Sequence, residues 1–187
     1  MAELKELILL HSNDLHGDFL AEELDENLLG GISMLSGYVN KVRNESDNTV
    51  YCIAGDMLQG SIIDREYRGM STIEIMNMLG PDVASIGNHE VDYGLAHLLF
   101  LERCARFPIV CANLFIKQPY TRLFLPHIIL EKGGLRIMFI GIITSEIMHG
   151  MTKDMLSSFV DVGDAAREVG QICNAWRTTD IDLTVLL

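Results

Sequence analysis

The sequence predicts an α/β fold in which mixed β-sheets are flanked by helices. Four short apolar runs in the first part of the chain each end in glycine or polar residues, which is typical of strands buried in a sheet. Segments with apolar residues three and four positions apart follow these runs and predict helices that cover the sheet. Farther along, two apolar runs flank Gly133-Gly134, which predicts an antiparallel hairpin and therefore a mixed sheet.

The first strand is expected at residues 7–10, a continuous apolar run that suits a strand buried on both faces. Residues 22–27 are acidic and are expected to form a loop. The helical pattern of residues 32–42 comes next, and the second strand is expected at residues 50–54. A loop with a short helical turn is expected at residues 57–69, because this segment combines glycine, serine and mixed charges.

The next helix is expected to begin near Ser71, since Ser71 and Glu74 have capping-box spacing, and to stop at Gly80-Pro81. Residues 83–86 are expected to form the third strand. A mostly apolar helix at residues 95–106 is closed by a proline, and the fourth strand follows at residues 109–112.

The hairpin is expected to occupy residues 128–143. Residues 144–158 are expected to form an irregular connection, and residues 164–177 a helix with one apolar stripe. The final run, residues 183–187, is expected to be a buried strand. A domain that stops inside a core strand is unusual, so we expect the chain to be a fragment of a longer protein.

The composition is that of a globular domain. The chain has 187 residues, of which 49% are hydrophobic and 21% charged, so one substantial core is expected. The net charge of −12 argues against binding to nucleic-acid polymers or anionic membranes, which requires clustered Lys and Arg. The sequence contains no apolar run of about 18 residues that would predict a membrane span. The four cysteines form no CxxC pair, which favours a reduced compartment.

The N-terminal residues predict a cytoplasmic protein. Glu3, Lys5 and Glu6 precede only the short apolar run of residues 7–10, so the basic start and long apolar middle of a signal peptide are missing. An export signal removed from the chain would leave no trace in this sequence.

Three polar clusters follow the first three predicted strands. In an extended segment residues two apart point the same way, so Asp14 and His16 are expected to present a carboxylate and an imidazole to one cation, with His11 facing elsewhere. Asp56 follows the second strand, and its two carboxylate oxygens suit it to bridge two metal ions. Each cluster alone is also compatible with an ordinary solvated turn.

The third cluster is Gly87-Asn88-His89-Glu90, with Asp92 two residues beyond it. Asn88 offers a neutral carbonyl ligand, whereas His89 is not expected to point the same way from an extended segment and is a better candidate for a catalytic group. Asp92 is expected to approach the His89 ring if the loop bends into a helical turn, which would favour imidazolium. Glu90 is expected to have a structural role.

Together the clusters supply oxygen-rich ligands and one imidazole, which suit divalent manganese, magnesium, zinc, iron or cobalt. Two such ions about 3.5–4 Å apart would polarise a phosphoryl oxygen and lower the pKa of a bridging water. A protonated His89 would then stabilise the charge or protonate the leaving oxygen.

The motif set resembles the 5′-nucleotidase and 2′,3′-cyclic phosphodiesterase family of the calcineurin-like metallophosphoesterases. The matching segments are residues 11–17 (HSNDLHG), 55–61 (GDMLQGS), 73–80 (IEIMNMLG), 87–94 (GNHEVDYG) and 112–114 (ANL). The resemblance implies a four-layer α/β/β/α sandwich with two central mixed sheets. It also implies that residues 1–187 are the N-terminal portion of the catalytic domain and that a C-terminal substrate domain is absent.

By the same resemblance, Asp14 and His16 bind the first metal, Asp56 bridges, Asn88 binds the second metal, and His89 with Asp92 forms a catalytic dyad. The substrate would be a nucleotide or another small phosphoester. The family completes its metal site with histidines that would follow residue 187, and the remaining candidates His97, His127 and His149 are poor substitutes. The chain alone is therefore expected to be weakly active or inactive.

Two alternatives remain open at this point. One is a catalytically silent domain that keeps a metal-binding or phosphate-binding surface and acts by interaction. The other is a soluble α/β domain whose polar clusters are only turn residues. The sequence does not identify the substrate, the metals or the oligomeric state.

Overall fold

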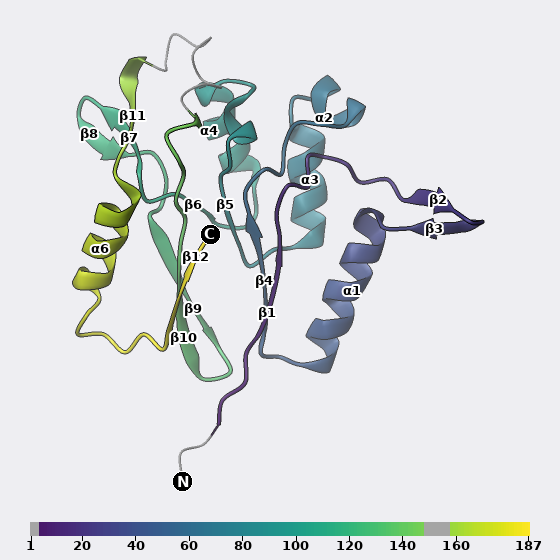
Figure 1. Ribbon diagram of the computed structural model, residues 1–187, viewed down its shortest axis with the longest axis horizontal. Coiled ribbons are helices and arrows are strands. Elements are labelled where there is room, and N and C mark those ends of the chain that lie inside the picture. The colour runs from purple at the N-terminus through teal and green to yellow at the C-terminus, as the bar shows by residue number, and fades with distance from the viewer. Residues whose placement is uncertain (1–3, 148–157) are drawn as a thin grey trace.

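The computed structural model describes residues 4–147 and 158–187, and Figure 1 shows two central sheets with helices on both sides. The first sheet has the strand order β1-β4-β5-β6, and all of its neighbouring strands run parallel. Its strands are the four predicted from the sequence, with bounds β1 (Ile8–Ser12), β4 (Thr49–Ala54), β5 (Val83–Ser85) and β6 (Ile109–Val110). Because these strands are parallel, their carboxyl ends lie at one edge of the sheet.

The second sheet is mixed, as predicted from the two-glycine turn. Strands β9 (His127–Lys132) and β10 (Leu135–Ile140) form an antiparallel hairpin through Gly133 and Gly134, both of which have positive φ. Strand β12 (Leu183–Leu186) pairs with β10 in parallel. The strand order is β12-β10-β9.

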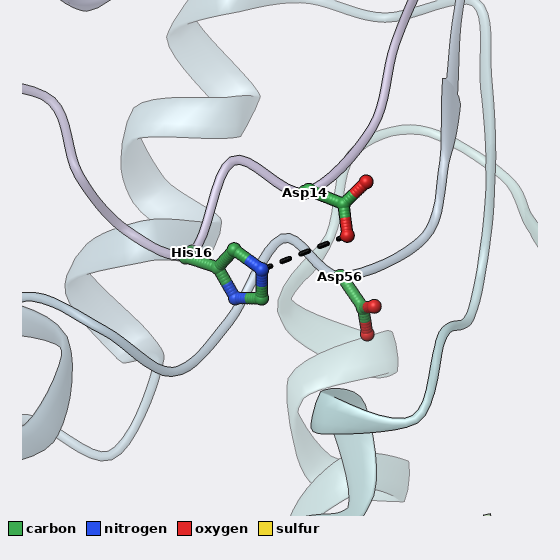
Figure 2. Close-up of side chains that lie close together, drawn as sticks. All are labelled: Asp14, His16 and Asp56. Atoms are coloured by element: carbon green, nitrogen blue, oxygen red, sulfur yellow. Dashed lines mark ion pairs between the residues drawn. The ribbon is translucent and has the colours of Figure 1, made fainter. Parts of the chain in front are cut away.

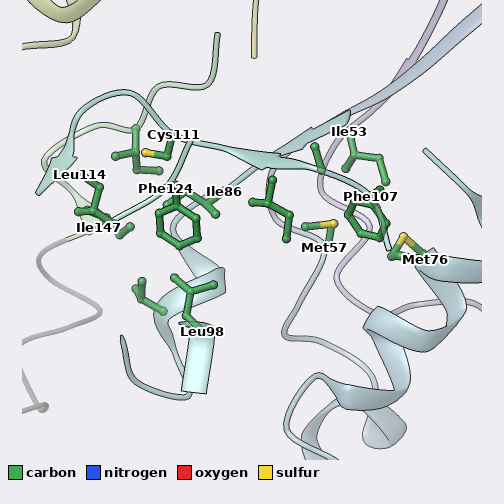
Figure 3. Packing of buried hydrophobic residues seen from close by; sticks show 14 of the residues in the cluster. Ile53, Met57, Met76, Ile86, Leu98, Phe107, Cys111, Leu114, Phe124 and Ile147 are labelled. Atoms are coloured by element: carbon green, nitrogen blue, oxygen red, sulfur yellow. The ribbon is translucent and has the colours of Figure 1, made fainter. Parts of the chain in front are cut away.

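Alternating side chains of β4 separate two layers of the core. Tyr51 and Ile53 pack among buried residues contributed by the helices of one face. Figure 3 shows Ile53 in this packing. These helices are α1 (Gly31–Glu45), α3 (Met70–Leu79) and α4 (Leu95–Cys104). Val50 and Cys52 point the opposite way and pack against residues of the second sheet. The period of two therefore places β4 between a helical layer and a second sheet.

Strand β10 repeats this alternation one layer farther. Ile137 and Phe139 face the first sheet, whereas Met138 and Ile140 pack with Ile172 of helix α6 (Ala165–Ala175). The order of layers is helices, sheet, sheet, helix, as Figure 1 also shows. The predicted four-layer α/β/β/α arrangement is confirmed.

Two strands are less buried than the sequence predicted. Leu9 of β1 is 37% exposed, and Leu183 and Leu186 of β12 are 41% and 51% exposed. Each of these strands lies at the end of its sheet, where the neighbouring layers cover it only in part. An apolar run predicted the strand correctly but not its position within the sheet.

The acidic segment at residues 22–27 is a hairpin and not a loop. Strands β2 (Glu22–Leu24) and β3 (Asn27–Leu29) pair in antiparallel fashion and project from the body of the molecule (Figure 1). Asp25 and Glu26 connect them with positive φ, the backbone conformation of a tight two-residue hairpin turn.

A small sheet was not predicted. It has the order β11-β7-β8 and consists of β7 (Leu114–Lys117), β8 (Tyr120–Arg122) and β11 (Val160–Val162). These strands have three or four residues each, too few for an alternating pattern to stand out from the sequence. The predicted irregular connection at residues 144–158 lies largely outside the described residues.

The observed start of α3 shows that the predicted capping box at Ser71 was wrong. The short helical turn expected before residue 69 is α2 (Ile62–Glu66), whose N-cap Ser61 accepts the N–H of Asp64. Helix α3 starts one residue before Ser71, after Gly69 in the left-handed conformation, so Ser71 forms no capping box and its hydroxyl instead donates to the carbonyl of Ile63. The helix stops at Gly80 as predicted. Within residues 4–147 and 158–187, no helix combines the length and apolar character needed to cross a bilayer.

Candidate metal and catalytic site

The three polar clusters lie at the carboxyl ends of adjacent parallel strands. Asp14 follows β1, Asp56 follows β4, and the turn with His89 follows β5 and begins the single-turn 3-10 helix η1 (His89–Val91). The strand order places these three ends side by side. The convergence expected from the sequence is therefore a consequence of the parallel register.

Left-handed backbone, and not an extended segment, brings Asp14 and His16 together. Asp14, His16 and Asp56 have φ values of 52°, 51° and 53°. The alternation expected for an extended chain does not apply to residues in this conformation, so that part of the sequence argument was wrong. The His16 N–H donates to the Asp56 carbonyl at 3.0 Å, and the Asp14 N–H donates to the Gly55 carbonyl at 3.3 Å. The two loops thus hold each other in place.

Asp14, His16 and Asp56 form a compact set of ligand atoms, shown in Figure 2. One ligand atom from each residue lies within 4.8 Å of the other two. His16 Nε2 is 3.6 Å from an Asp14 carboxylate oxygen, and His16 and Asp56 are partly buried. Two carboxylates and an imidazole at this separation fit a divalent cation of the manganese, zinc or iron type.

The hydrogen bonds of His16 determine which ring nitrogen faces this cluster. Nδ1 lies 3.2 Å from the Leu58 carbonyl oxygen and 3.0 Å from the Gln59 carbonyl oxygen. A carbonyl oxygen only accepts, so Nδ1 carries the proton and donates. The lone pair is therefore on Nε2, the atom that faces Asp14. Metal-binding histidines commonly use this arrangement, in which the second nitrogen is held by a backbone carbonyl.

His89 and Asp92 form a hydrogen-bonded pair beside the cluster. Their Nδ1 and Oδ2 atoms are 2.7 Å apart, because η1 bends the chain into the helical turn that the sequence argument required. The hydrogen bond that His89 donates to Asp92 is the main cause that raises the pKa of His89, opposed by partial burial. The His89 and His16 rings are 5.0 Å apart between centroids. A protonatable imidazole therefore lies next to the candidate metal ligands.

Asn88 lies between the end of β5 and His89 and is exposed. The peptide that follows it is tied to the cluster, since the His89 N–H donates to the Asp56 carboxylate at 2.9 Å. Asp56 therefore contacts the turn that contains Asn88. The role of Asn88 as a ligand of a second metal remains a prediction.

Glu90 has a larger structural role than the sequence indicated. Its side chain is 2% exposed and accepts four backbone N–H groups, which belong to Asp56 (3.0 Å), Met57 (2.7 Å), Leu58 (3.3 Å) and Gly87 (2.5 Å). Burial raises the pKa of Glu90, and the N–H donors act in the opposite direction. No local pattern in the sequence indicates contacts between residues more than 30 positions apart.

Gly87 allows the loop of Asp56 to approach this turn. A Cβ at position 87 would overlap the Asp56 carboxylate, so we expect Gly87→Ala to displace Asp56, to destabilise the fold and to weaken Mn²⁺ binding. Gly37→Ala is the matched control, because a Cβ at this α1 position meets nothing within 4 Å. The control should raise the free energy of unfolding by about 0.5–1 kcal/mol. Chemical denaturation and Mn²⁺ titration of both variants check this, and unchanged Mn²⁺ affinity in Gly87→Ala would contradict it.

Two other histidines, His97 and His127, have contacts away from the cluster. His97 Nε2 lies 2.6 Å from the Arg68 carbonyl oxygen, and the His127 ring packs against Trp176 with centroids 5.5 Å apart. Burial lowers the pKa of His127. His149 lies outside the described residues. Among the residues that the structure describes, only Asp14, His16 and Asp56 form a group of three carboxylate, imidazole or thiol ligands.

This chain is similar to known proteins in both sequence and fold. A profile of the calcineurin-like phosphoesterase family matches residues 7–169. The chain is 35% identical to the 5′-nucleotidase of Mus musculus over 153 residues and 33% identical to the snake venom 5′-nucleotidase of Naja atra over 152 residues. Each alignment covers 75% of this chain, and the chain spans 27% of the mouse protein and 29% of the venom protein. Among solved structures, the 5′-nucleotidase precursor from Thermus thermophilus matches with a TM-score of 0.83 and 25% identity, covering 96% of this chain and 36% of that chain.

These relatives correct the prediction of a cytoplasmic protein. One of them is a venom enzyme, and venom is a secreted fluid. The stretch of sequence that matches this chain therefore also occurs in an exported protein. The physical reason for the error is that export signals are segments separate from the folded domain, so the composition of the domain does not report them.

Proposed function

The chain belongs to the calcineurin-like phosphoesterase family, and we propose that the protein that contains it hydrolyses phosphoesters of nucleotides with the help of divalent metal ions. The observation that supports this most directly is the convergence of Asp14, His16 and Asp56 at the strand ends, with the His89–Asp92 pair beside them. The names of the relatives support a nucleotide as the substrate class. Both nucleoside 5′-monophosphates and 2′,3′-cyclic nucleotides are proposed substrates.

In this proposal Asp14 and His16 hold a first metal ion, Asp56 bridges to a second, and Asn88 binds the second. Bound divalent ions polarise a phosphoryl oxygen and lower the pKa of water, which yields a nucleophile near neutral pH. Residues 1–187 form the N-terminal portion of the catalytic domain, and the remaining ligands and the substrate domain belong to other parts of the protein. Residues 1–187 alone should then turn over substrate weakly or not at all.

His89 acts as the acid in this proposal. Its Nδ1 is held by Asp92 at 2.7 Å, so Nε2 is the nitrogen that remains available to a substrate. Asp92 raises the pKa of His89 and thereby favours the imidazolium form. The Nε2–H can stabilise charge on the phosphoryl group or transfer its proton to the leaving oxygen.

The full-length protein should hydrolyse a nucleoside 5′-monophosphate or a 2′,3′-cyclic nucleotide in the presence of Mn²⁺. Removal of the metal with a chelator should abolish the activity, because the carboxylates and imidazole of the cluster do not activate water without it, and added Mn²⁺ should restore it. Phosphate release or product chromatography measures the effect. A protein that binds Mn²⁺ but leaves both substrates intact would instead be the catalytically silent domain.

A further inference from the structure

Asp64 is a completely buried carboxylate in α2 that none of the roles above uses. Its side chain is 0% exposed and accepts the Gln59 N–H at 2.7 Å, the Tyr93 hydroxyl at 2.7 Å and the Thr72 hydroxyl. Burial, followed by the bond to Asp64, raises the pKa of Tyr93, so this hydroxyl keeps its proton and donates. All three partners are donors, so both oxygens of the Asp64 side chain act as acceptors.

One peptide group joins Asp64 to His16. The N–H of the peptide between Leu58 and Gln59 donates to Asp64, and the carbonyl of the same peptide lies 3.2 Å from His16 Nδ1. The N–H and C=O of a trans peptide point in opposite directions, so Asp64 and His16 lie on opposite sides of it. Hydrogen bonds arranged in such a chain polarise one another, which strengthens the bond that the imidazole donates.

The backbone next to His16 also packs against the Asp64 side chain. A Cβ at Gly17 would lie 2.8 Å from the Asp64 Cβ, so only glycine lets this backbone pass over the carboxylate. The Gly17 N–H donates to the Met57 carbonyl at 2.8 Å, which keeps the two loops in contact on this side. Asp64 therefore supports His16 both through the peptide that its ring contacts and through the residue that follows it.

We infer that Asp64 is a positioning residue that holds His16 in the Nδ1–H tautomer, with Nε2 directed at the metal site. Removal of the carboxylate leaves the Gln59 N–H without its acceptor and frees Gln59 to shift. Both carbonyl contacts of the ring, with Leu58 at 3.2 Å and Gln59 at 3.0 Å, then weaken, so the ring loses its preferred tautomer. The effect on metal affinity rests on the function proposed above. The effect on the tautomer does not, because it is a property of the metal-free protein.

The test compares Asp64→Ala with Asp64→Asn in the full-length protein. Asparagine keeps an oxygen for the Gln59 N–H, and the hydroxyls of Thr72 and Tyr93 can each rotate to suit the amide, so it should retain the wild-type behaviour. Nitrogen-15 NMR of the His16 ring reports its tautomer in the metal-free protein, at a pH at which the imidazole is neutral. Titration calorimetry reports the affinity for Mn²⁺.

Two further variants separate positioning from general stability. Tyr93→Phe removes a different bond to the same carboxylate and leaves the Gln59 contact intact. Asp82→Ala is the matched control, because Asp82 also accepts a backbone N–H, that of Tyr51 at 2.8 Å, but near the other end of β4. Both should lower the midpoint of unfolding and leave the His16 tautomer and Mn²⁺ affinity unchanged.

In Asp64→Ala the Nδ1–H population of His16 should fall and Mn²⁺ affinity should drop by about 10–100-fold. A folded Asp64→Ala with the tautomer and Mn²⁺ affinity of the wild type overturns the inference. If Asp64→Ala does not fold, nitrogen-15 NMR of the metal-free wild-type protein provides the test. A predominant Nε2–H form of His16 in the wild type overturns the inference as well. A protein that shows the tautomer effect but hydrolyses no nucleotide contradicts the proposed function and leaves the inference standing.

Discussion

His89→Asn in the full-length protein should lower kcat for nucleotide hydrolysis by about 10²–10⁴-fold, the range typical of a removed general acid. His89 lies beside the candidate metal ligands, and its Nε2 is the nitrogen that Asp92 leaves free. The asparagine keeps the backbone N–H that bonds Asp56 at 2.9 Å, so Mn²⁺ affinity should change little. Steady-state kinetics and calorimetry measure the two quantities.

His97→Asn serves as the matched control for His89→Asn. His97 is on α4, where its ring contacts the Arg68 carbonyl, and no catalytic role is proposed for it. This variant should keep kcat close to that of the wild type. Asp92→Asn should give an intermediate loss, because it weakens the support of the His89 imidazolium without removing the ring. Near-wild-type turnover in His89→Asn would contradict the proposed role of His89 as the acid.

Glu90→Gln should lower the free energy of unfolding by about 1.5–3 kcal/mol, the usual contribution of a hydrogen bond to a charged group. The amide nitrogen of glutamine would face two of the four N–H donors that the carboxylate now accepts. One of these donors belongs to Asp56, so the variant should also weaken Mn²⁺ binding. Urea denaturation and Mn²⁺ titration check both effects.

Glu168→Gln is a control of the same kind. Glu168 is also buried, at 7% exposure, and pairs with Arg122 at 2.5 Å, in a part of the molecule that shares no hydrogen bond with Asp56 or His16 among those described. This variant should also lose stability, but Mn²⁺ affinity should stay unchanged. Equal loss of Mn²⁺ affinity in the two variants would mean that Glu90 acts only through overall stability.

The location of the candidate site could be predicted from sequence alone, and its local geometry could not. Apolar runs followed by Asp14, Asp56 and His89 predict parallel strand ends, and such ends converge in any sheet of this kind. The left-handed backbone of Asp14 and His16 depends on hydrogen bonds to the Asp56 loop, which is about 40 residues away in sequence. The conformational propensity of a residue depends on its immediate neighbours in sequence and therefore does not predict a backbone conformation that a distant loop imposes.

The four layers of the fold were expected from the family resemblance, whereas local patterns predicted most of the elements that form them. Continuous apolar runs correctly indicated β4 and β10, and the three- and four-residue spacing of apolar residues correctly indicated α1. Burial at a sheet edge depends on which strands are neighbours, so the exposure of β1 was not foreseen. The expected structural role of Glu90 did not identify its partners, and Asp64 was not singled out, because hydrogen bonds to backbone N–H groups leave no mark on composition.

The left-handed conformation shared by Asp14, His16 and Asp56 makes the stability of the fold compete with the proposed metal binding. A left-handed residue other than glycine costs about 1–2 kcal/mol, although Asp and His tolerate it better than most. Glycine at any of these three positions would relieve that cost and remove a proposed metal ligand at the same time. Laboratory evolution that selects for heat resistance alone would therefore tend to erase this centre, and such a selection needs turnover as a second criterion.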